Sequence, residues 1–226
     1  MLISAIVGID LRNTLDMDAT IKGFDLTDEN INKILDEIAK IDIGDNVNFD
    51  VEMIKDIRDE AEYSGYRITL NGKYDTINQR FKIDISTGDK ITPKEIKYNY
   101  ELMFENKTIE ILAYNLETIL SEKFEGIISK GIANTRARDY YDIYILEKFQ
   151  KQNIDNEILK EAIENTFKER NTEYYLEKIE KQIQDIENSN DLKKIWENYK
   201  NKFLYATYIT YQDVMDAIKE IEEIVK

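Results

Sequence analysis

The stretch DLRNTLDMDAT, residues 10–20, alternates polar and apolar side chains along most of its length. Its even positions are all polar, and its odd positions include four apolar residues, Leu11, Leu15, Met17 and Ala19. A period of two is typical of a strand with one buried face, so this stretch predicts a strand. In such a strand Asp16 and Asp18 point to the same polar side, where both carboxylates could approach one or two cations.

The number of acidic residues in the chain limits what this pair can mean alone. Asp and Glu supply 46 of 226 residues, so about nine acidic pairs spaced two apart are expected by chance. Two ordinary exposed acids are therefore the alternative to a metal site. Close carboxylates repel each other unless solvent or a cation relieves the charge, which keeps the metal interpretation open.

Composition excludes several classes of chemistry. With 31 basic residues the formal net charge is -15, so a nucleic-acid backbone would be repelled except at a local basic patch or through metal ions. The chain has no Cys and no His, which excludes thiolate nucleophiles, Cys/His zinc sites, imidazole bases and disulfides. The remaining carboxylates and hydroxyls favour hard cations such as Mg²⁺.

Up to about residue 95 the patterns are mixed and predict a small sheet with a helix against it. Thr27 can cap a helix whose apolar stripe is Ile31, Ile34, Leu35, Ile38 and Ile41. Residues 47–54 alternate like a strand. Residues 66–75 and 80–86 do so too, joined by the short segment TINQ, which indicates an antiparallel hairpin.

After Pro93 the period becomes helical almost throughout. The predicted helices cover residues 99–112, 116–130, 135–150, 156–170, 173–187, 192–203 and 211–225. We therefore expect an α+β protein with an α/β domain at residues 1–95 and a helical domain at residues 96–226. The apolar run LISAIVGI, residues 2–9, is too short to span a bilayer and lacks the basic flank of a signal peptide. A cytoplasmic protein without a membrane contact is expected.

A third carboxylate could complete a two-metal site beside the acidic pair. Asp84 is central in RFKIDIS, residues 80–86, with Ile83 and Ile85 facing the other way. An ordinary exposed strand aspartate is the alternative.

A positive island interrupts the acidic chain between residues 123 and 138. Its charged residues are Lys123, Glu125, Lys130, Arg136 and Arg138, which sum to +3. A triphosphate could bind there.

Two further acids follow the island. Asp139 and Asp142 are three positions apart on a predicted helix and so share a face, with Arg136 one turn before Asp139. Surface ion pairs on this helix are the alternative to a functional site. The neighbouring Tyr140, Tyr141 and Tyr144 indicate core or interface packing rather than a platform for base stacking.

Taken together and in order, these stretches resemble the AbiEii toxin family of nucleotidyltransferases, the toxin half of type IV abortive-infection toxin-antitoxin systems, within the DNA polymerase beta superfamily. The matching pieces are RNTLDMD, RFKIDISTGDKITP, YNLETILSEKFEGIISKG and NTRARDYYDIYIL. Each piece alone is weak, and their order makes the resemblance specific.

The resemblance implies a role for each matched residue. It makes Asp16 and Asp18 the catalytic, metal-binding pair, with Asp84 as a third metal ligand. It makes Lys123 the lysine that contacts nucleotide phosphates and Asp139 a catalytic aspartate. The implied nucleotide-binding residues are Arg12, Thr14, Lys123, Arg136, Arg138 and Asp142.

The implied function is Mg²⁺-dependent transfer of a nucleotidyl group from an NTP to a hydroxyl acceptor in phage defence, with two metal ions in the site. GTP is one candidate nucleotide and tRNA one candidate acceptor. A cognate antitoxin, which need not bind the toxin directly, is the implied partner. The family's Gly-Gly or Gly-Ser/Thr element, expected just ahead of MLISAIVGID, is absent from this sequence. An N-terminally shortened, catalytically inactive nucleotide-binding or interaction protein is therefore the alternative function.

Overall fold

The computed structural model describes residues 2–14, 16–23, 25, 27–57, 65–87, 90–102 and 105–226. It divides into two compact units. We call Asn13–Asp89 the sheet unit, and Leu2–Arg12 together with Lys90–Lys226 the helical unit. The predicted fold class is confirmed: α+β, with a small mixed sheet, flanking helices and a helical C-terminal part.

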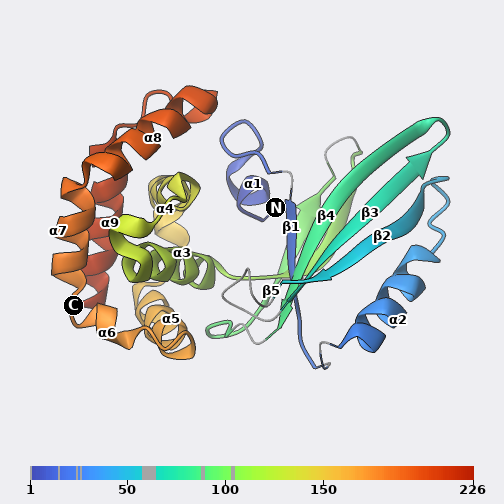
Figure 1. The fold of residues 1–226 in the computed structure, drawn as a ribbon, viewed down its shortest axis with the longest axis horizontal. Coiled ribbons are helices and arrows are strands. Elements are labelled where there is room, and N and C mark those ends of the chain that lie inside the picture. The colour runs from blue at the N-terminus through green and yellow to red at the C-terminus, as the bar shows by residue number, and fades with distance from the viewer. Residues whose placement is uncertain are drawn as a thin grey trace. The chain divides into compact units, whose positions relative to one another are not determined.

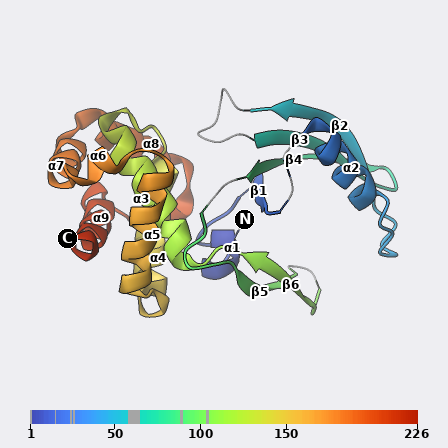
Figure 2. The same ribbon diagram turned by 90° about the horizontal axis from the view of Figure 1, so that it is seen from below.

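The described strands of the sheet unit form one mixed sheet in the order β1-β4-β3-β2 (Figure 2). Their bounds are Asp16–Ile21 for β1, Asn48–Asp56 for β2, Gly65–Tyr74 for β3 and Ile77–Thr87 for β4. β1 runs parallel to β4, and the other neighbours are antiparallel. The first strand begins at Asp16 rather than Asp10, because the amides of Leu11 and Arg12 bond back to the Gly8 carbonyl in a turn.

One face of this sheet is apolar and packs with helix α2, Asp28–Ala39. Its core consists of Ile31, Leu35, Tyr66, Ile68, Leu70 and Ile85. The predicted cap is confirmed, since Thr27 Oγ1 accepts a hydrogen bond from the Asn30 amide at 3.2 Å. The predicted stripe is too long, because Ile38 and Ile41 are 57% and 64% exposed and Ile41 lies beyond the end of the helix.

The hairpin of β3 and β4 is confirmed, but its turn is shorter than predicted. Tyr74 pairs with Ile77, so only Asp75 and Thr76 form the loop and most of the predicted TINQ connection belongs to β4. Asp75 has φ of 52°, the left-handed conformation that Asp tolerates better than most residues. This turn sets the register of both strands.

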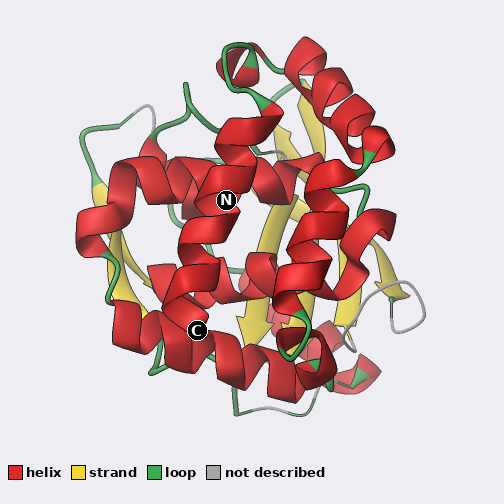
Figure 3. Ribbon diagram, turned by 90° about the vertical axis from the view of Figure 1, so that its left-hand side faces the viewer, coloured by secondary structure: helices red, strands yellow, loops and turns green. Residues whose placement is uncertain are grey.

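The helical unit is built around two central helices. Its helices are α1 (Leu2–Val7), α3 (Leu116–Lys130), α4 (Ala137–Gln150), α5 (Asn156–Glu169), α6 (Glu173–Leu176), α7 (Ile179–Asn188), α8 (Asn190–Lys202) and α9 (Tyr211–Val225) (Figure 1). Short 3-10 helices η1 (Gly131–Ala133), η2 (Lys151–Asn153) and η3 (Leu204–Ala206) connect them. Figure 3 shows these helices in red. α3 and α4 contact each other, and their fully buried side chains include Phe124, Tyr141 and Leu146.

The prediction of a helix at residues 99–112 is wrong. This region forms a hairpin of β5, Ile96–Glu101, and β6, Thr108–Ala113. Tyr98 pairs with Ile111 on one face, and Lys97 Nζ lies 2.7 Å from Glu110 Oε1 on the other. Alternating faces with paired side chains satisfy a hairpin better than a helix.

Two other features of the helical unit were not predicted from the sequence. The helix expected at residues 173–187 is interrupted between α6 and α7. The apolar run at the N-terminus forms α1 and packs against the helical core. Among the described residues, no helix has both the length and the apolar character needed to cross a membrane.

Candidate functional site

Asp18, one of the two predicted metal-binding aspartates, lies on β1 of the sheet unit. Asp16 is the first residue of β1, but its side chain lies outside the part of the chain that the structure describes. Asp18 is exposed and stands directly opposite Asp84 of β4. Two residues further along the two strands, Thr20 pairs with Ser86, and their hydroxyl oxygens are 3.1 Å apart. Side chains of paired residues therefore project to the same side of the sheet here. Thr14 is half-buried in the loop before β1.

Asp84 is bound by an arginine that the sequence analysis missed. Arg67 of β3 donates from Nε to Asp84 Oδ1 at 2.8 Å and from Nη2 to Oδ2 at 2.7 Å. The two residues are cross-strand partners, and both side chains are partly exposed. This bidentate pair places a cation beside the carboxylate that was predicted to bind metal. The described residues contain no group of three or more Asp or Glu side chains arranged to hold a metal ion.

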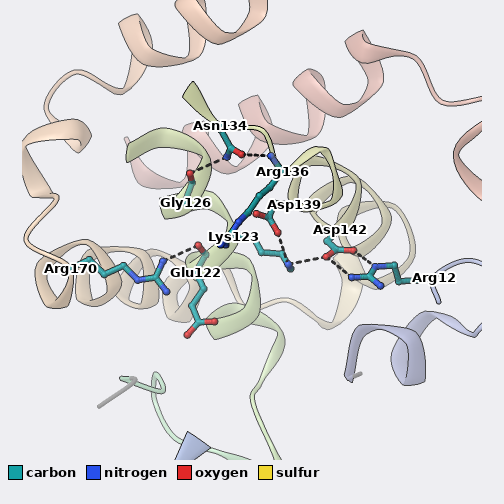
Figure 4. A network of polar contacts seen from close by, with 9 residues as sticks. All are labelled: Arg12, Glu122, Lys123, Gly126, Asn134, Arg136, Asp139, Asp142 and Arg170. Atoms are coloured by element: carbon teal, nitrogen blue, oxygen red, sulfur yellow. Dashed lines mark hydrogen bonds and ion pairs between the residues drawn. The ribbon is translucent and has the colours of Figure 1, made fainter. Parts of the chain in front are cut away.

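Four other predicted residues meet in the helical unit (Figure 4). Lys123 of α3 lies between two carboxylates of α4, with Nζ 2.9 Å from Asp139 Oδ1 and 2.8 Å from Asp142 Oδ2. Arg12, after the turn that follows α1, donates from Nε to Asp142 Oδ1 at 2.6 Å and from Nη2 to Oδ2 at 3.2 Å. Asp139, Asp142, Lys123 and Arg12 thus form one ion network, which we call the α4 network.

The four side chains of the α4 network differ in burial. The Asp142 side chain is fully buried and that of Arg12 is 8% exposed, whereas the side chains of Lys123 and Asp139 are 19% and 17% exposed. An ammonium has three N–H donors, and the two carboxylates account for two of those on Lys123. The network is therefore charge-balanced, and Lys123 and Asp139 are its partly exposed members.

The charges of the α4 network stabilise one another. Burial alone would raise the pKa of Asp142, but the charge of Lys123 and the hydrogen bond from Arg12 outweigh it and lower this pKa. Burial would likewise lower the pKa of Lys123, yet the charges of Asp142 and Asp139 raise it. Both groups are consequently ionised at neutral pH.

Asn134 connects the two helices that carry the network. Its side-chain amide donates to the Gly126 carbonyl of α3 at 3.0 Å, and its Oδ1 accepts from the Arg136 amide at 2.7 Å, just before α4 (Figure 4). Asn134 is 1% exposed, so these bonds are made away from solvent. They fix the start of α4 relative to α3 and thereby the separation of Asp139 from Lys123.

The basic residues of the positive island are more exposed in the structure than its one acidic residue. Arg136 is exposed and Arg138 half-buried at the start of α4. Glu125, the one acid of the island, is buried and bound by Arg170 Nη1 at 2.5 Å, so its charge is compensated from α5's C-terminal end. The exposed charge near α4's N-terminus is accordingly basic.

The structure thus brings together Arg12, Lys123, Asp139 and Asp142, and separately Asp18 and Asp84. The sequence analysis missed Arg67, Asn134 and the hydroxyl of Tyr141, which donates to the Leu11 carbonyl. Hairpin register would have found Arg67, had the turn been placed correctly. The bonds of Asn134 and Tyr141 leave no signal in local sequence patterns.

The chain was compared with family models, curated proteins and solved structures. A family model described as nucleotidyl transferase AbiEii toxin, type IV TA system, matches residues 1–219. Among solved structures, a Helicobacter pylori protein described as a candidate nucleotidyltransferase is 16% identical, with a TM-score of 0.46, over 100% of this chain and 85% of that one. JHP933 from Helicobacter pylori is also 16% identical, with a TM-score of 0.42, over 100% of this chain and 79% of that one. No curated protein matches significantly.

Proposed function

Because the chain belongs to the AbiEii nucleotidyltransferase toxin family of type IV toxin-antitoxin systems, we propose that it transfers a nucleotidyl group from an NTP to a hydroxyl acceptor. In this reaction the acceptor oxygen bonds to the α-phosphorus, the bond to the bridging oxygen breaks, and pyrophosphate leaves. The hydroxyl proton passes to solvent or to a nearby carboxylate. GTP and the acceptor end of tRNA are candidate substrates, and the antitoxin is the regulatory partner.

The observation that carries this proposal is the position of Lys123. Its ammonium is held by Asp139 and Asp142 at the edge of the helical unit, partly exposed and with one donor beyond those the two carboxylates engage. The exposed Arg136 and the half-buried Arg138 lie on the same helix start as Asp139. A fixed ammonium with nearby guanidinium groups can neutralise charge that develops on a triphosphate and on departing pyrophosphate.

Asp16 and Asp18 of the sheet unit would bind the metal ion. Asp18 is an exposed carboxylate of β1. Carboxylate oxygens are the ligands that Mg²⁺ prefers, so this donor set fits the ion. Bound Mg²⁺ would activate the acceptor oxygen and stabilise the phosphates. Arg67 would compete with it for Asp84 and so tune that carboxylate as a third ligand.

Within the helical unit, Arg12 and Asp142 hold the segment before β1. Lys123 would act on the nucleotide directly.

A transfer assay with radiolabelled NTP, Mg²⁺ and bulk RNA tests the proposal. Asp18→Asn should lower label transfer by at least about 100-fold, and Lys123→Met should lower it with a raised KM for NTP. Asp75→Asn is the matched control, since it removes an exposed carboxylate from the same unit at the hairpin turn. Full transfer by Asp18→Asn would contradict the proposal. Calorimetry with GTP and Mg²⁺ separates a nucleotide-binding protein without catalysis from a transferase.

A further inference from the structure

The C-terminal part of the chain has one basic segment between two acidic ones. Residues 192–210 contain four lysines and one glutamate, whereas residues 155–191 contain eleven acidic and five basic residues, and residues 211–226 contain five acidic and two basic ones. The basic segment also holds five aromatic residues, among them the single tryptophan. Basic residues interleaved with aromatic ones are typical of surfaces that bind single-stranded nucleic acid.

The basic segment exposes an aromatic ring in the structure. It forms most of α8, then η3 and the turn before α9. In this turn region Leu204 is 92% and Tyr208 94% exposed, more than any other large apolar side chain among the described residues. An exposed tyrosine ring offers a face on which an unpaired base can stack.

Lysines of α8 lie beside this ring. The Trp196 Nε1 donates to the carbonyl of Ile209 at 3.1 Å, which holds the residue after Tyr208 against the helix. Lys193 is three positions before Trp196 and Lys200 four positions after it, so both share its side of α8. Two ammonium groups therefore lie on the part of α8 that contacts the exposed turn.

The acids nearest these lysines are weak competitors for a phosphate. Lys200 Nζ lies 3.2 Å from Oε1 of Glu197, whose side chain is 59% exposed. Lys194 Nζ lies 3.4 Å from Asp191 Oδ1, and both side chains are more than 70% exposed. Lys202, the last residue of α8, is also exposed. Exposed ion pairs contribute little to stability, so phosphate oxygens can replace these carboxylates.

The basic segment packs against α4 at two points. The Tyr205 ring of η3 lies 4.9 Å from the ring of Tyr141, centroid to centroid, one residue before the aspartate that binds Arg12 in the α4 network. Near the start of α8, Leu192 lines a small cavity together with Ala137 of α4. The positive island, which ends at residue 138, therefore adjoins the basic segment within the helical unit.

Resting on the proposed function, we propose that residues 192–210 hold the hydroxyl acceptor and that this acceptor is a single-stranded end of a nucleic acid. The lysines contact backbone phosphates, and Tyr208 stacks on an unpaired base. A duplex is a poor ligand for this surface, because its bases stack on one another and leave no free face for the ring.

Fluorescence anisotropy with labelled strands of about 12 nucleotides tests the surface without NTP or Mg²⁺. The wild type should bind single-stranded RNA or DNA more tightly than a duplex of the same sequence, and the tighter of the two strands identifies the acceptor. Tyr208→Ala should weaken binding at least about fivefold through loss of one stacked base. The double variant Lys200→Gln with Lys202→Gln should weaken binding and make the log–log salt dependence shallower by about 1 to 1.5.

The acidic segment offers matched controls. Tyr174 is 58% exposed, with Lys178 Nζ 3.9 Å from its ring centroid, and Lys181 is exposed nearby in the sequence. Tyr174→Ala, and Lys178→Gln with Lys181→Gln, should leave binding unchanged. Equal losses in both sets of variants, or a wild type that binds neither strand, would overturn the proposal. Displacement of the strand by polyglutamate as effectively as by unlabelled strand would overturn it too, because an acidic protein would then be the better partner.

Transfer kinetics distinguish this surface from the nucleotide site. Tyr208→Ala should raise the KM for the oligonucleotide at least about fivefold and keep the KM for NTP within about twofold of the wild type, because the α4 network is unchanged. An unchanged KM for the oligonucleotide overturns the proposal. A wild type that binds strands through residues 192–210 but transfers no label would contradict the proposed function, while the binding surface stands.

Discussion

The two units contain the same side-chain pair, an arginine forked onto an aspartate, in opposite surroundings. In the helical unit the side chains of Arg12 and Asp142 are 8% and 0% exposed. In the sheet unit those of Arg67 and Asp84 are 40% and 29% exposed. A buried pair that loses one member leaves an uncompensated charge, whereas an exposed pair is replaced by water. The comparison indicates that the Arg12–Asp142 pair is part of the scaffold and that the Arg67–Asp84 pair can rearrange.

The largest effect should come from breaking the buried pair. Asp142→Asn leaves Arg12 and Lys123 facing an uncharged amide, and we expect the free energy of unfolding to fall by about 3–5 kcal/mol. The single tryptophan, Trp196, lies buried in α8 and reports unfolding of the helical unit by fluorescence in urea. Asp139→Asn should cost less, since Lys123 keeps Asp142 as its partner. Equal losses in the two variants would contradict this ranking.

Acid should remove the same contribution from the wild type. The folded pKa of Asp142 lies below its unfolded value of about 3.9, so its stabilisation is complete above about pH 4 and is lost as pH falls through the folded pKa. The difference in unfolding free energy between wild type and Asp142→Asn should therefore shrink below about pH 4. The raised pKa of Lys123 keeps its contribution intact until pH rises beyond about 10.4. If the difference in unfolding free energy between wild type and Asp142→Asn stayed constant below about pH 4, the ionised Asp142 carboxylate would not be the source of the stabilisation.

The exposed pair should give the smallest change in stability and a gain in metal binding. Arg67→Gln should cost less than about 1 kcal/mol of unfolding free energy and strengthen Mg²⁺ binding roughly 3–10-fold by freeing Asp84. Calorimetric titration with Mg²⁺ measures this. Arg80→Gln is the control, because Arg80 is an exposed arginine of the same sheet, paired 2.5 Å from Glu52. Unchanged or weaker Mg²⁺ binding by Arg67→Gln would argue against Asp84 as a ligand.

Local sequence signals predicted the helices well wherever both period and cap were present. α3 and α9 have the predicted bounds, residues 116–130 and 211–225. Asn115 caps the first, and Thr210 with Asp213 forms a capping box on the second. Because these bonds lie within one turn of the chain, the sequence contains all the partners needed to predict them.

Prediction failed where the deciding contact crosses between strands. The β5–β6 hairpin depends on cross-strand pairs such as Tyr98 with Ile111. The spacing of apolar residues over 99–112 predicted one helix instead and gave no sign of these pairs. The misplaced turn of the β3–β4 hairpin would have shifted the register by four residues and put Asn71, not Arg67, opposite Asp84. A small error in a loop is therefore enough to hide a side-chain partner.

The candidate site was predicted as a set of residues but not as a set of bonds. Arg136 precedes Asp139 by one turn and was a possible ion-pair partner, yet Asp139 binds Lys123 of α3. The partner of Asp142 lies 130 positions away at Arg12. Local spacing cannot encode such a contact, because it arises only when α1, α3 and α4 pack together.

The long separation between Arg12 and its partner has a consequence for the growing polypeptide. Leu2–Arg12 is translated before α4, and Asp142 follows Arg12 by 130 residues, on the order of ten seconds later. Until then α1 has no helical core to pack on, and the segment before β1 has no anchor. A nascent chain can therefore complete its sheet before Arg12 finds its partner, so the α4 network forms only after α4 has been translated.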